Sequence, residues 1–165
     1  MEIEIIGESE IMILSIDPGC TESAYTLLDD NLKPVQFGKV PNIELLCMCE
    51  DLSKGNGNEM AIEMVASYGM AVGQEVFETV FWIGRFWEAF NGARTKVYRK
   101  EVKINLCHTM KAKDSNIRQA LIDRFGVVGT IKNKGWFYGF KADIWSAYAV
   151  GVTYYDTYLK EVQKC

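Results

Sequence analysis

Residues 11–19 read Ile-Met-Ile-Leu-Ser-Ile-Asp-Pro-Gly, an apolar run that ends in the carboxylate of Asp17. Short apolar runs that stop at turn residues are typical of buried strands. Pro18 and Gly19 then let the chain turn away directly after the carboxylate. The pattern therefore predicts a buried first strand with an acidic side chain at its carboxyl end.

Two strand-like segments follow the first strand and predict a meander. They span residues 22–29 and 35–40, with the turn signal Asp30-Asn31 between them. Strands joined by short turns pair antiparallel, so the first three strands form one side of a sheet.

A fourth strand is predicted on the other side of the first. A helical pattern over residues 41–52 leads into the apolar residues 60–66. Since a crossover through a helix joins parallel strands, we expect this strand to lie parallel to the first. Glu63 then stands near the same sheet edge as Asp17.

The remaining elements complete an α/β fold. The sequence predicts helices at 74–90, 114–125 and 143–160, a fifth strand at 94–99, and a loop at 127–140 rich in Gly, Lys and aromatic residues. The helix at 114–125 has the cap signal Asp114-Ser115 and the stop signal Gly126. We expect a mixed five-stranded sheet flanked by helices, with residues 1–165 forming a single domain.

The helix predicted at 74–90 is apolar around most of its surface. One face is predicted to carry Val76, Val80, Ile83, Trp87 and Phe90, and the apolar surface extends through Phe77, Phe81, Trp82 and Phe86. A helix that is apolar all round has to be covered on two sides. We expect one side to pack on the sheet and the other on a second subunit, which predicts a homodimer. The alternative is a helix buried twice within one monomer.

The composition is that of a folded domain without a membrane segment. The chain is 48% hydrophobic, and it has neither a secretory leader pattern nor the roughly 20 apolar residues that span a bilayer. Its five cysteines lack the spacing of a disulfide framework. We therefore expect a cytoplasmic protein with reduced thiols and no contact with a membrane.

Charge is segregated along the chain although the net charge is only −4. Residues 1–83 carry 3 basic and 15 acidic side chains, whereas residues 84–142 carry 13 basic and 4 acidic ones. A basic block of this density is a reasonable footprint for a nucleic-acid backbone. The alternative is a solvated face held by salt bridges.

Asp17, Glu63 and Asp143 predict a metal site that cuts phosphodiesters. Two Mg²⁺ ions neutralise the phosphate, activate water and stabilise the departing oxygen, and Mg²⁺ prefers oxygen ligands. In this interpretation Asp17 bridges both ions, Glu63 holds one and Asp143 the other. A simpler alternative to metal binding is that Asp17 caps a turn and that Asp143 caps the start of a helix. Glu63 is harder to explain otherwise, because it carries a charge into a strand that looks buried.

The same residues resemble a known family. The resemblance rests on Ser15-Ile-Asp17-Pro-Gly19, Ala61-Ile-Glu63, Val102-Lys103 before Lys111-Ala-Lys113-Asp114, and Ala142-Asp143. Over residues 11–158 the chain resembles RuvC-type Holliday junction resolvases of the RNase H-like superfamily, especially the phage-type members. The resemblance implies a homodimer that binds a four-way DNA junction in recombination and repair and nicks two strands of like polarity. It also implies two Mg²⁺ ions per site, with Mn²⁺ as a substitute, and action in the bacterial host cytoplasm if a phage encodes the protein.

Two positions depart from the family pattern. The family has two acidic residues, or a histidine and an acid, three positions apart on the last helix, and Ser146 stands at the second of these positions in this chain. A hydroxyl is a weaker metal ligand, so either three carboxylates suffice or activity is reduced. The family also places a base-stacking aromatic just after the glutamate of strand four, and Tyr68 is the candidate here.

Six lysines are the further candidates for DNA contacts. Lys103, Lys111 and Lys113 lie in the segment that resembles the family's phosphate-contacting region, and Lys132, Lys134 and Lys141 flank an aromatic run at residues 136–140. Lysines neutralise phosphates while aromatics stack on unpaired bases. The alternative is that these aromatics close the core.

Two other functions remain open. One is an RNase H-like nuclease that acts on flaps or RNA–DNA hybrids with the same metals. The other is a catalytically weak or silent module that binds branched DNA, which Ser146 makes possible.

Overall fold

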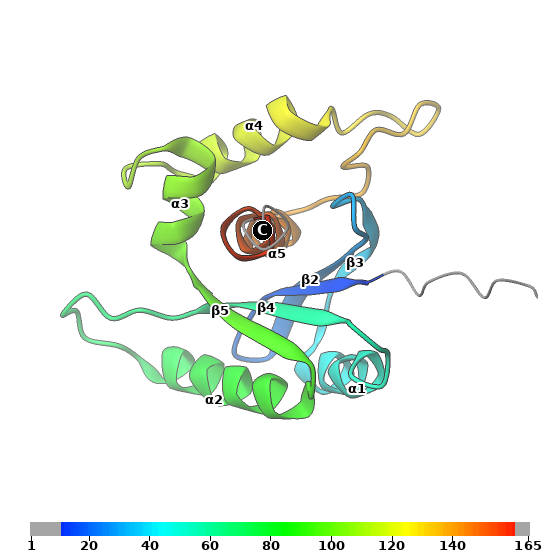
Figure 1. The fold of residues 1–165 in the computed structure, drawn as a ribbon. Helices are drawn as coiled ribbons and strands as arrows, with labels where there is room; N and C mark the ends of the chain where they lie inside the picture. The colour runs from blue at the N-terminus through cyan, green and yellow to red at the C-terminus, as the bar shows by residue number, and fades with distance from the viewer. Residues whose placement is uncertain (1–10, 161–165) are drawn as a thin grey trace, which may run out of the picture.

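The computed structural model describes residues 11–160 as a five-stranded sheet with helices on both faces (Figure 1). Its elements are β1 (Ile13–Asp17), β2 (Glu22–Leu28), β3 (Pro34–Pro41), α1 (Asn42–Leu52), β4 (Glu59–Met64), α2 (Gln74–Ala89), β5 (Ala93–Tyr98), α3 (Arg99–Cys107), α4 (Asp114–Phe125), α5 (Asp143–Tyr154) and a π-helical turn η1 (Tyr155–Leu159). The strand order is β3-β2-β1-β4-β5. β1 pairs antiparallel with β2 and parallel with β4, so the predicted meander and the parallel fourth strand are confirmed.

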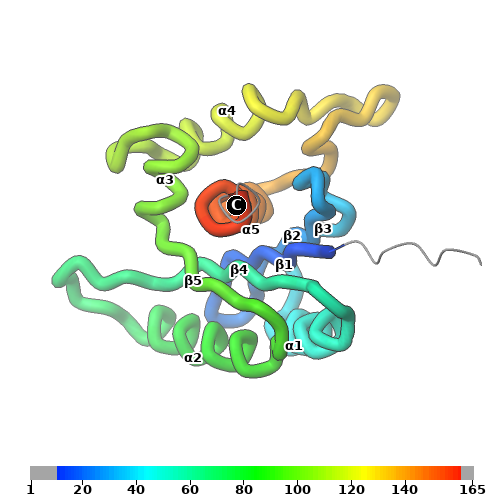
Figure 2. Tube along the Cα trace, in the orientation of Figure 1, coloured from blue at the N-terminus to red at the C-terminus, as the bar shows by residue number. Residues whose placement is uncertain are grey.

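The two faces of the sheet are covered differently. α1 and α2 lie on one face, while α5 lies on the other with α3 and α4 beyond it (Figures 1 and 2). One core cluster joins α5 to the sheet, α3, α4 and the loop before α5, and a second joins α1 and α2 to the sheet. α5 is thus covered on opposite sides, which explains why nearly every residue in it is buried. Every helix in residues 11–160 is too short or too polar to cross a bilayer.

The backbone of α5 approaches the sheet closely at Gly151. A Cβ at this position would lie 2.7 Å from Leu28 Cδ1 and 2.8 Å from Ser15 Oγ. Beneath it, the buried hydroxyls of Ser15 and Thr26 form a 2.5 Å hydrogen bond. Glycine at 151 therefore sets how deeply α5 sits on β1 and β2, and with it the position of Asp143 at the start of the helix.

α2 packs on the sheet mainly through its carboxyl half. Ile83, Phe86 and Phe90 are buried, whereas Val80 is 38% exposed and Phe81 is 61% exposed. Of the predicted apolar face, Ile83, Trp87 and Phe90 pack in the core cluster with α1 and the sheet, whereas Val76 and Val80 lie outside that cluster. The alternative that the monomer buries this helix on two sides is therefore wrong. Packing of α2 on a second subunit stays a prediction.

Three further details differ from the sequence predictions. α3 was missed, because Val102 is its only buried residue and its pattern is largely polar. The predicted helix at 143–160 is an α-helix only to Tyr154 and continues as the π-turn η1. α4 ends at Gly126 as predicted, but its N-cap is Lys113, so Asp114 is the first helical residue and not the cap.

The aromatic run before α5 closes the core. Phe137 and Phe140 are buried, and Trp136 stacks on Phe125 with ring centres 5.5 Å apart. Trp136 Nε1 also donates a 3.1 Å hydrogen bond to the Tyr148 hydroxyl in α5. Of the two interpretations left open by the sequence, core closure is the correct one for these three aromatics.

Candidate active site

The three predicted metal ligands come from three different elements at one edge of the sheet. Asp17 is the last residue of β1, Glu63 lies near the end of β4, and Asp143 is the first residue of α5. β1 and β4 run parallel in the register that pairs Ile16 with Ile62, so Asp17 and Glu63 follow next to each other. The parallel pairing expected from the sequence therefore brings these two carboxyl groups together.

The turn after β1 is braced against the start of α1. Gly19 donates its backbone N–H to Ser23 Oγ at 3.0 Å, and Asn42 Nδ2 donates to the Gly19 carbonyl at 2.9 Å. A Cβ at Gly19 would collide with the Glu22 carbonyl oxygen, so glycine is required by this close approach. The buried Ser23 and Asn42 side chains are themselves 2.6 Å apart, and together these contacts hold Asp17 at the end of its strand.

Burial and like charge make the carboxyl pair unfavourable without a cation. The pKa of Asp17 is raised to about 8, first by burial and then by the charges of Glu63 and Asp143. Burial also raises the pKa of Glu63, although Arg99 opposes the rise. The interaction with Glu63 also raises the pKa of Asp17, which makes Asp17 the more readily protonated of the two. Such a pair gains from any divalent cation that neutralises both groups.

Two basic side chains already pair with members of the carboxylate cluster, which consists of Asp17, Glu63 and Asp143. Lys39 Nζ on β3 lies 2.6 Å from Asp143 Oδ2, and Arg99 Nη1 at the start of α3 lies 4.0 Å from Glu63 Oε1. Arg99 also forms a short ion pair with Asp114. Within residues 11–160 no three acidic, His or Cys side chains are already arranged to hold a metal ion. The contact with Lys39 explains this for Asp143, whose carboxylate turns to the lysine.

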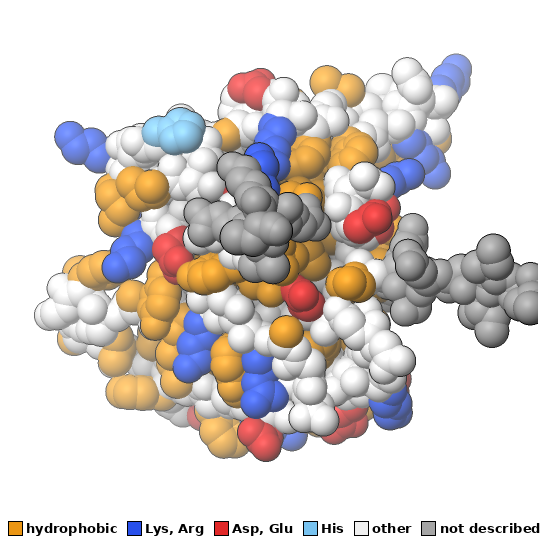
Figure 3. Space-filling model, viewed as in Figure 1, with side chains coloured by type: hydrophobic (Ala, Val, Ile, Leu, Met, Phe, Trp, Pro, Cys, Tyr) orange, Lys and Arg blue, Asp and Glu red, His pale blue; other side chains and the backbone are white. Residues whose placement is uncertain are grey.

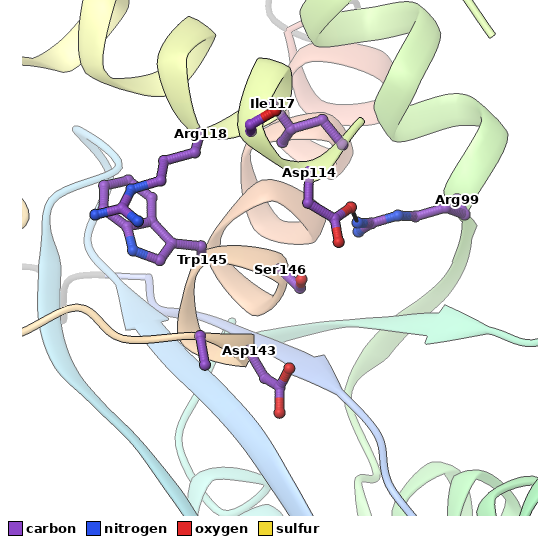
Figure 4. A pocket seen from close by; sticks show the side chains of 9 residues that line it. Arg99, Asp114, Ile117, Arg118, Asp143, Trp145 and Ser146 are labelled. Carbon is purple, nitrogen blue, oxygen red and sulfur yellow. Dashed lines mark hydrogen bonds and ion pairs between the residues drawn. The ribbon is translucent and has the colours of Figure 1, made fainter. Parts of the chain in front are cut away.

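The chemistry of the donor set nevertheless fits a hard divalent cation. Asp17, Glu63 and Asp143 supply carboxylate oxygens, the ligand type that Mg²⁺ prefers. The charge of Asp143 already acts on Asp17, so all three lie within electrostatic range. Ser146, one turn further along α5, lines the same cavity as Asp143 and adds a hydroxyl oxygen (Figure 4).

The predicted DNA-binding residues lie on several parts of the surface. Tyr68 is 68% exposed in the segment between β4 and α2. Lys103 is half-buried on α3, and the exposed lysines are Lys111 and Lys113 before α4, and Lys132, Lys134 and Lys141 before α5. In Figure 3 the Lys and Arg side chains are scattered over the visible face and do not form one block. Lys134 Nζ lies 5.2 Å from the Tyr138 ring centre, so part of this charge is held against the protein's own aromatics.

Lys39, Arg99, Asp114 and Arg118 were not predicted as site residues. Arg99 and Asp114 are each the first residue of a helix, and the helix starts bring them together across 15 positions. Lys39 reaches Asp143 across 104 positions. For Arg99 and Arg118 the only sequence signal was the concentration of basic residues after position 83, which does not show which of them faces the carboxylates; Lys39 lies outside that block.

Comparisons with known proteins give structural relatives only. No protein-family model matches the chain, and no curated protein sequence does. The structure is similar to that of T. thermophilus RuvC in complex with a Holliday junction substrate, with a TM-score of 0.64 and 15% identity over 92% of this chain and 96% of that one. A second structure of Thermus thermophilus RuvC matches with a TM-score of 0.62 and 14% identity over 92% of this chain and 97% of that one.

The sheet order, the flanking helices and the carboxylates at one sheet edge define an RNase H-like fold. Within that class the fold is similar to that of Thermus thermophilus RuvC over nearly all of the chain. This confirms the fold that the sequence predicts. The phage-type assignment and the catalytic roles of the individual residues stay predictions.

Proposed function

We propose that this protein is a divalent-metal-dependent endonuclease that resolves four-way DNA junctions and acts on other branched DNA. The observation that carries the proposal is the pair of interacting carboxyl groups, Asp17 and Glu63, at the ends of adjacent parallel strands, with the charge of Asp143 acting on Asp17. The similar RuvC structure was solved with a Holliday junction substrate, which supports the choice of DNA. We further infer that the chain acts as a single domain in the cytoplasm, that of the bacterial host if a phage encodes it.

Asp17, Glu63 and Asp143 are the proposed ligands of two Mg²⁺ ions, with Ser146 as a weaker fourth donor and Mn²⁺ as a substitute metal. Bound ions of this kind neutralise the phosphate, activate water and stabilise the departing oxygen. The chain supplies a half-buried site whose carboxyl groups repel each other and release a proton when a cation enters. Arg99 and Lys39 compete with the cation for Glu63 and Asp143, since each already pairs with one of them.

A homodimer through α2 is part of the proposal. Phe77 is 64% exposed and Phe81 61% exposed on the side of α2 that faces away from the sheet. Large apolar side chains that face solvent along one helix are typical of an interface. A two-fold dimer carries two identical sites, which suits paired nicks in strands of like polarity. The exposed lysines and Tyr68 are the proposed contacts to the DNA arms.

The test is cleavage of a fixed four-way junction by purified wild type and Glu63→Gln, with Mg²⁺ or with EDTA. We expect symmetric nicks from wild type with Mg²⁺ only, and at least a 100-fold lower rate from Glu63→Gln. Glu50→Gln is the matched control, because Glu50 is exposed at the end of α1 away from the carboxylate cluster. Equal nicking by Glu63→Gln and wild type refutes the assignment of Glu63.

The same assay separates the alternatives. A wild-type protein that binds the junction but never nicks it with Mg²⁺ or Mn²⁺ is a branched-DNA-binding module. A wild-type protein that cuts a flap or an RNA–DNA hybrid faster than the junction is a nuclease with another substrate. Either outcome replaces junction resolution as the function.

A further inference from the structure

A cavity of about 360 Å³ lies between the starts of α4 and α5 (Figure 4). Its walls include Arg99 from α3, Asp114 and Arg118 from α4, and Asp143 and Trp145 from α5. Because one water occupies about 30 Å³ of liquid, the space holds on the order of ten waters. Asp143 belongs to both the cavity and the carboxylate cluster, so the cavity adjoins the proposed cutting site.

Arg118 presents a positive charge to this cavity that is not neutralised. None of the ion pairs within residues 11–160 includes Arg118. Its guanidinium carbon lies 4.7 Å from the centre of the Trp145 ring, and Figure 4 shows the group lying over the indole. Trp145 is only 6% exposed, so it is a fixed platform. Stacking on it orients the guanidinium while its N–H groups remain available to a planar or tetrahedral anion.

The other charges of the cavity are matched in pairs. Arg99 pairs with Asp114, and Asp143 pairs with Lys39. Asp114 therefore does not cancel the charge of Arg118. The first turns of α4 and α5 also lie at this cavity, and helix starts carry unpaired N–H groups and a partial positive charge. The cavity is thus suited to an anion, although two carboxylates stand in its wall.

We propose that this cavity is a subsite for one backbone phosphate of the DNA strand, beside the phosphate at the carboxylate cluster, with Arg118 as its positioning residue. A phosphodiester matches the donors of a guanidinium and carries one negative charge. Fixing a neighbouring phosphate sets the register of the strand, so that one defined bond lies at Asp17 and Glu63. This inference rests on the proposed function, because it assumes that the anion belongs to DNA.

The first measurement is binding of a labelled four-way junction in EDTA, by fluorescence anisotropy, between 50 and 200 mM salt. Neutralising one phosphate contributes about 0.9 to the slope of log affinity against log salt. We expect Arg118→Gln to lower this slope by about 0.9, so that its affinity falls about 3.5-fold less than that of wild type across this range. Arg118→Lys restores the slope but not the full affinity, because a lysine cannot bind a phosphate in a bidentate manner.

Lys54→Gln is the matched control for the loss of one positive charge. Lys54 is exposed in the turn before β4, at the opposite edge of the sheet from the carboxylates. We expect this variant to keep the wild-type slope. If Arg118 has only a structural role, Arg118→Gln lowers the affinity but keeps the wild-type salt slope. In that case Arg118→Lys does not recover any of the lost affinity.

The second measurement locates the phosphate. Junctions are made with a single uncharged methylphosphonate at successive positions near the branch point. At one position we expect wild type to lose affinity while Arg118→Gln loses none, since that contact is already missing. Additive losses at every position, or a wild-type slope in Arg118→Gln, overturn the subsite and leave the proposed function intact. A wild-type protein that binds no junction overturns both.

Discussion

The neutral variant Asp17→Asn should stabilise the protein when metal is removed. Burial and the charges of Glu63 and Asp143 raise the pKa of Asp17 from 3.8 to about 8. At pH 7 the folded protein therefore holds a proton on Asp17 that the unfolded chain has released. Asparagine needs no such proton, and its amide can still donate a hydrogen bond to Glu63.

The size of the effect follows from the pKa. The pH interval between 3.8 and 7 is about three pH units, each worth about 1.36 kcal/mol, so the upper limit at pH 7 is about 4 kcal/mol. Because Asp17 and Glu63 titrate together, part of this energy belongs to the pair. We expect Asp17→Asn to raise the free energy of unfolding at pH 7 by about 2 to 4 kcal/mol.

The upward direction of the pKa shift of Asp17 also predicts how stability depends on pH. A carboxyl group with a raised pKa binds more protons in the folded state, so wild-type stability falls as pH rises from about 4 to about 8 and then levels off. Asp17→Asn should remove most of this decline. Urea unfolding in EDTA at pH 5, 7 and 9 measures it, with the exposed Asp51→Asn as control. A variant that is less stable than wild type at pH 9, or that keeps the same decline, refutes the reasoning.

Two other substitutions test the packing and the dimer. Gly151→Ala should lower the free energy of unfolding by about 1 to 3 kcal/mol, because the new Cβ meets Leu28 and Ser15. Gly84→Ala is the control: nothing lies within 4 Å of its Cβ, so it should raise the free energy of unfolding by about 0.5 to 1 kcal/mol. Urea unfolding compares them, and a stabilised Gly151→Ala would contradict the close approach of α5. Phe81→Asp should turn a wild-type dimer into a monomer in analytical ultracentrifugation, while Ile43→Asp, at an exposed apolar position on α1, should not. A monomeric wild type counts against the dimer.

The sheet was predictable because its strands carry strong local signals. The apolar run that ends at Asp17 and the crossover into the strand of Glu63 predict both the parallel pairing and the shared edge. The start of α5 at Asp143 was also predicted. α3 was not, since a helix that buries only Val102 has almost no periodic apolar pattern.

The charges around the site were beyond the reach of sequence patterns. The pairing of Lys39 with Asp143 joins residues 104 positions apart on β3 and α5. Arg99 meets Asp114 because two short helices begin side by side, one of which was not predicted. Such contacts depend on how elements pack and not on their own periodicity. The aromatics before α5 were ambiguous for a related reason, because base stacking and core closure require the same residue types.

The placement of Asp143 on α5 governs when the carboxylate cluster forms. This helix is held by β1 and β2 on one side and by α3 and α4 on the other, so its partners are spread across most of the polypeptide. Contacts between segments so distant in sequence cost loop-closure entropy and form slowly. A nascent chain whose synthesis has not passed residue 154 can pair Asp17 with Glu63 but lacks the packed helix that brings the third acid to them. Under the proposed nuclease function, a copy that ends before α5 therefore lacks one of its three metal ligands and does not cut DNA.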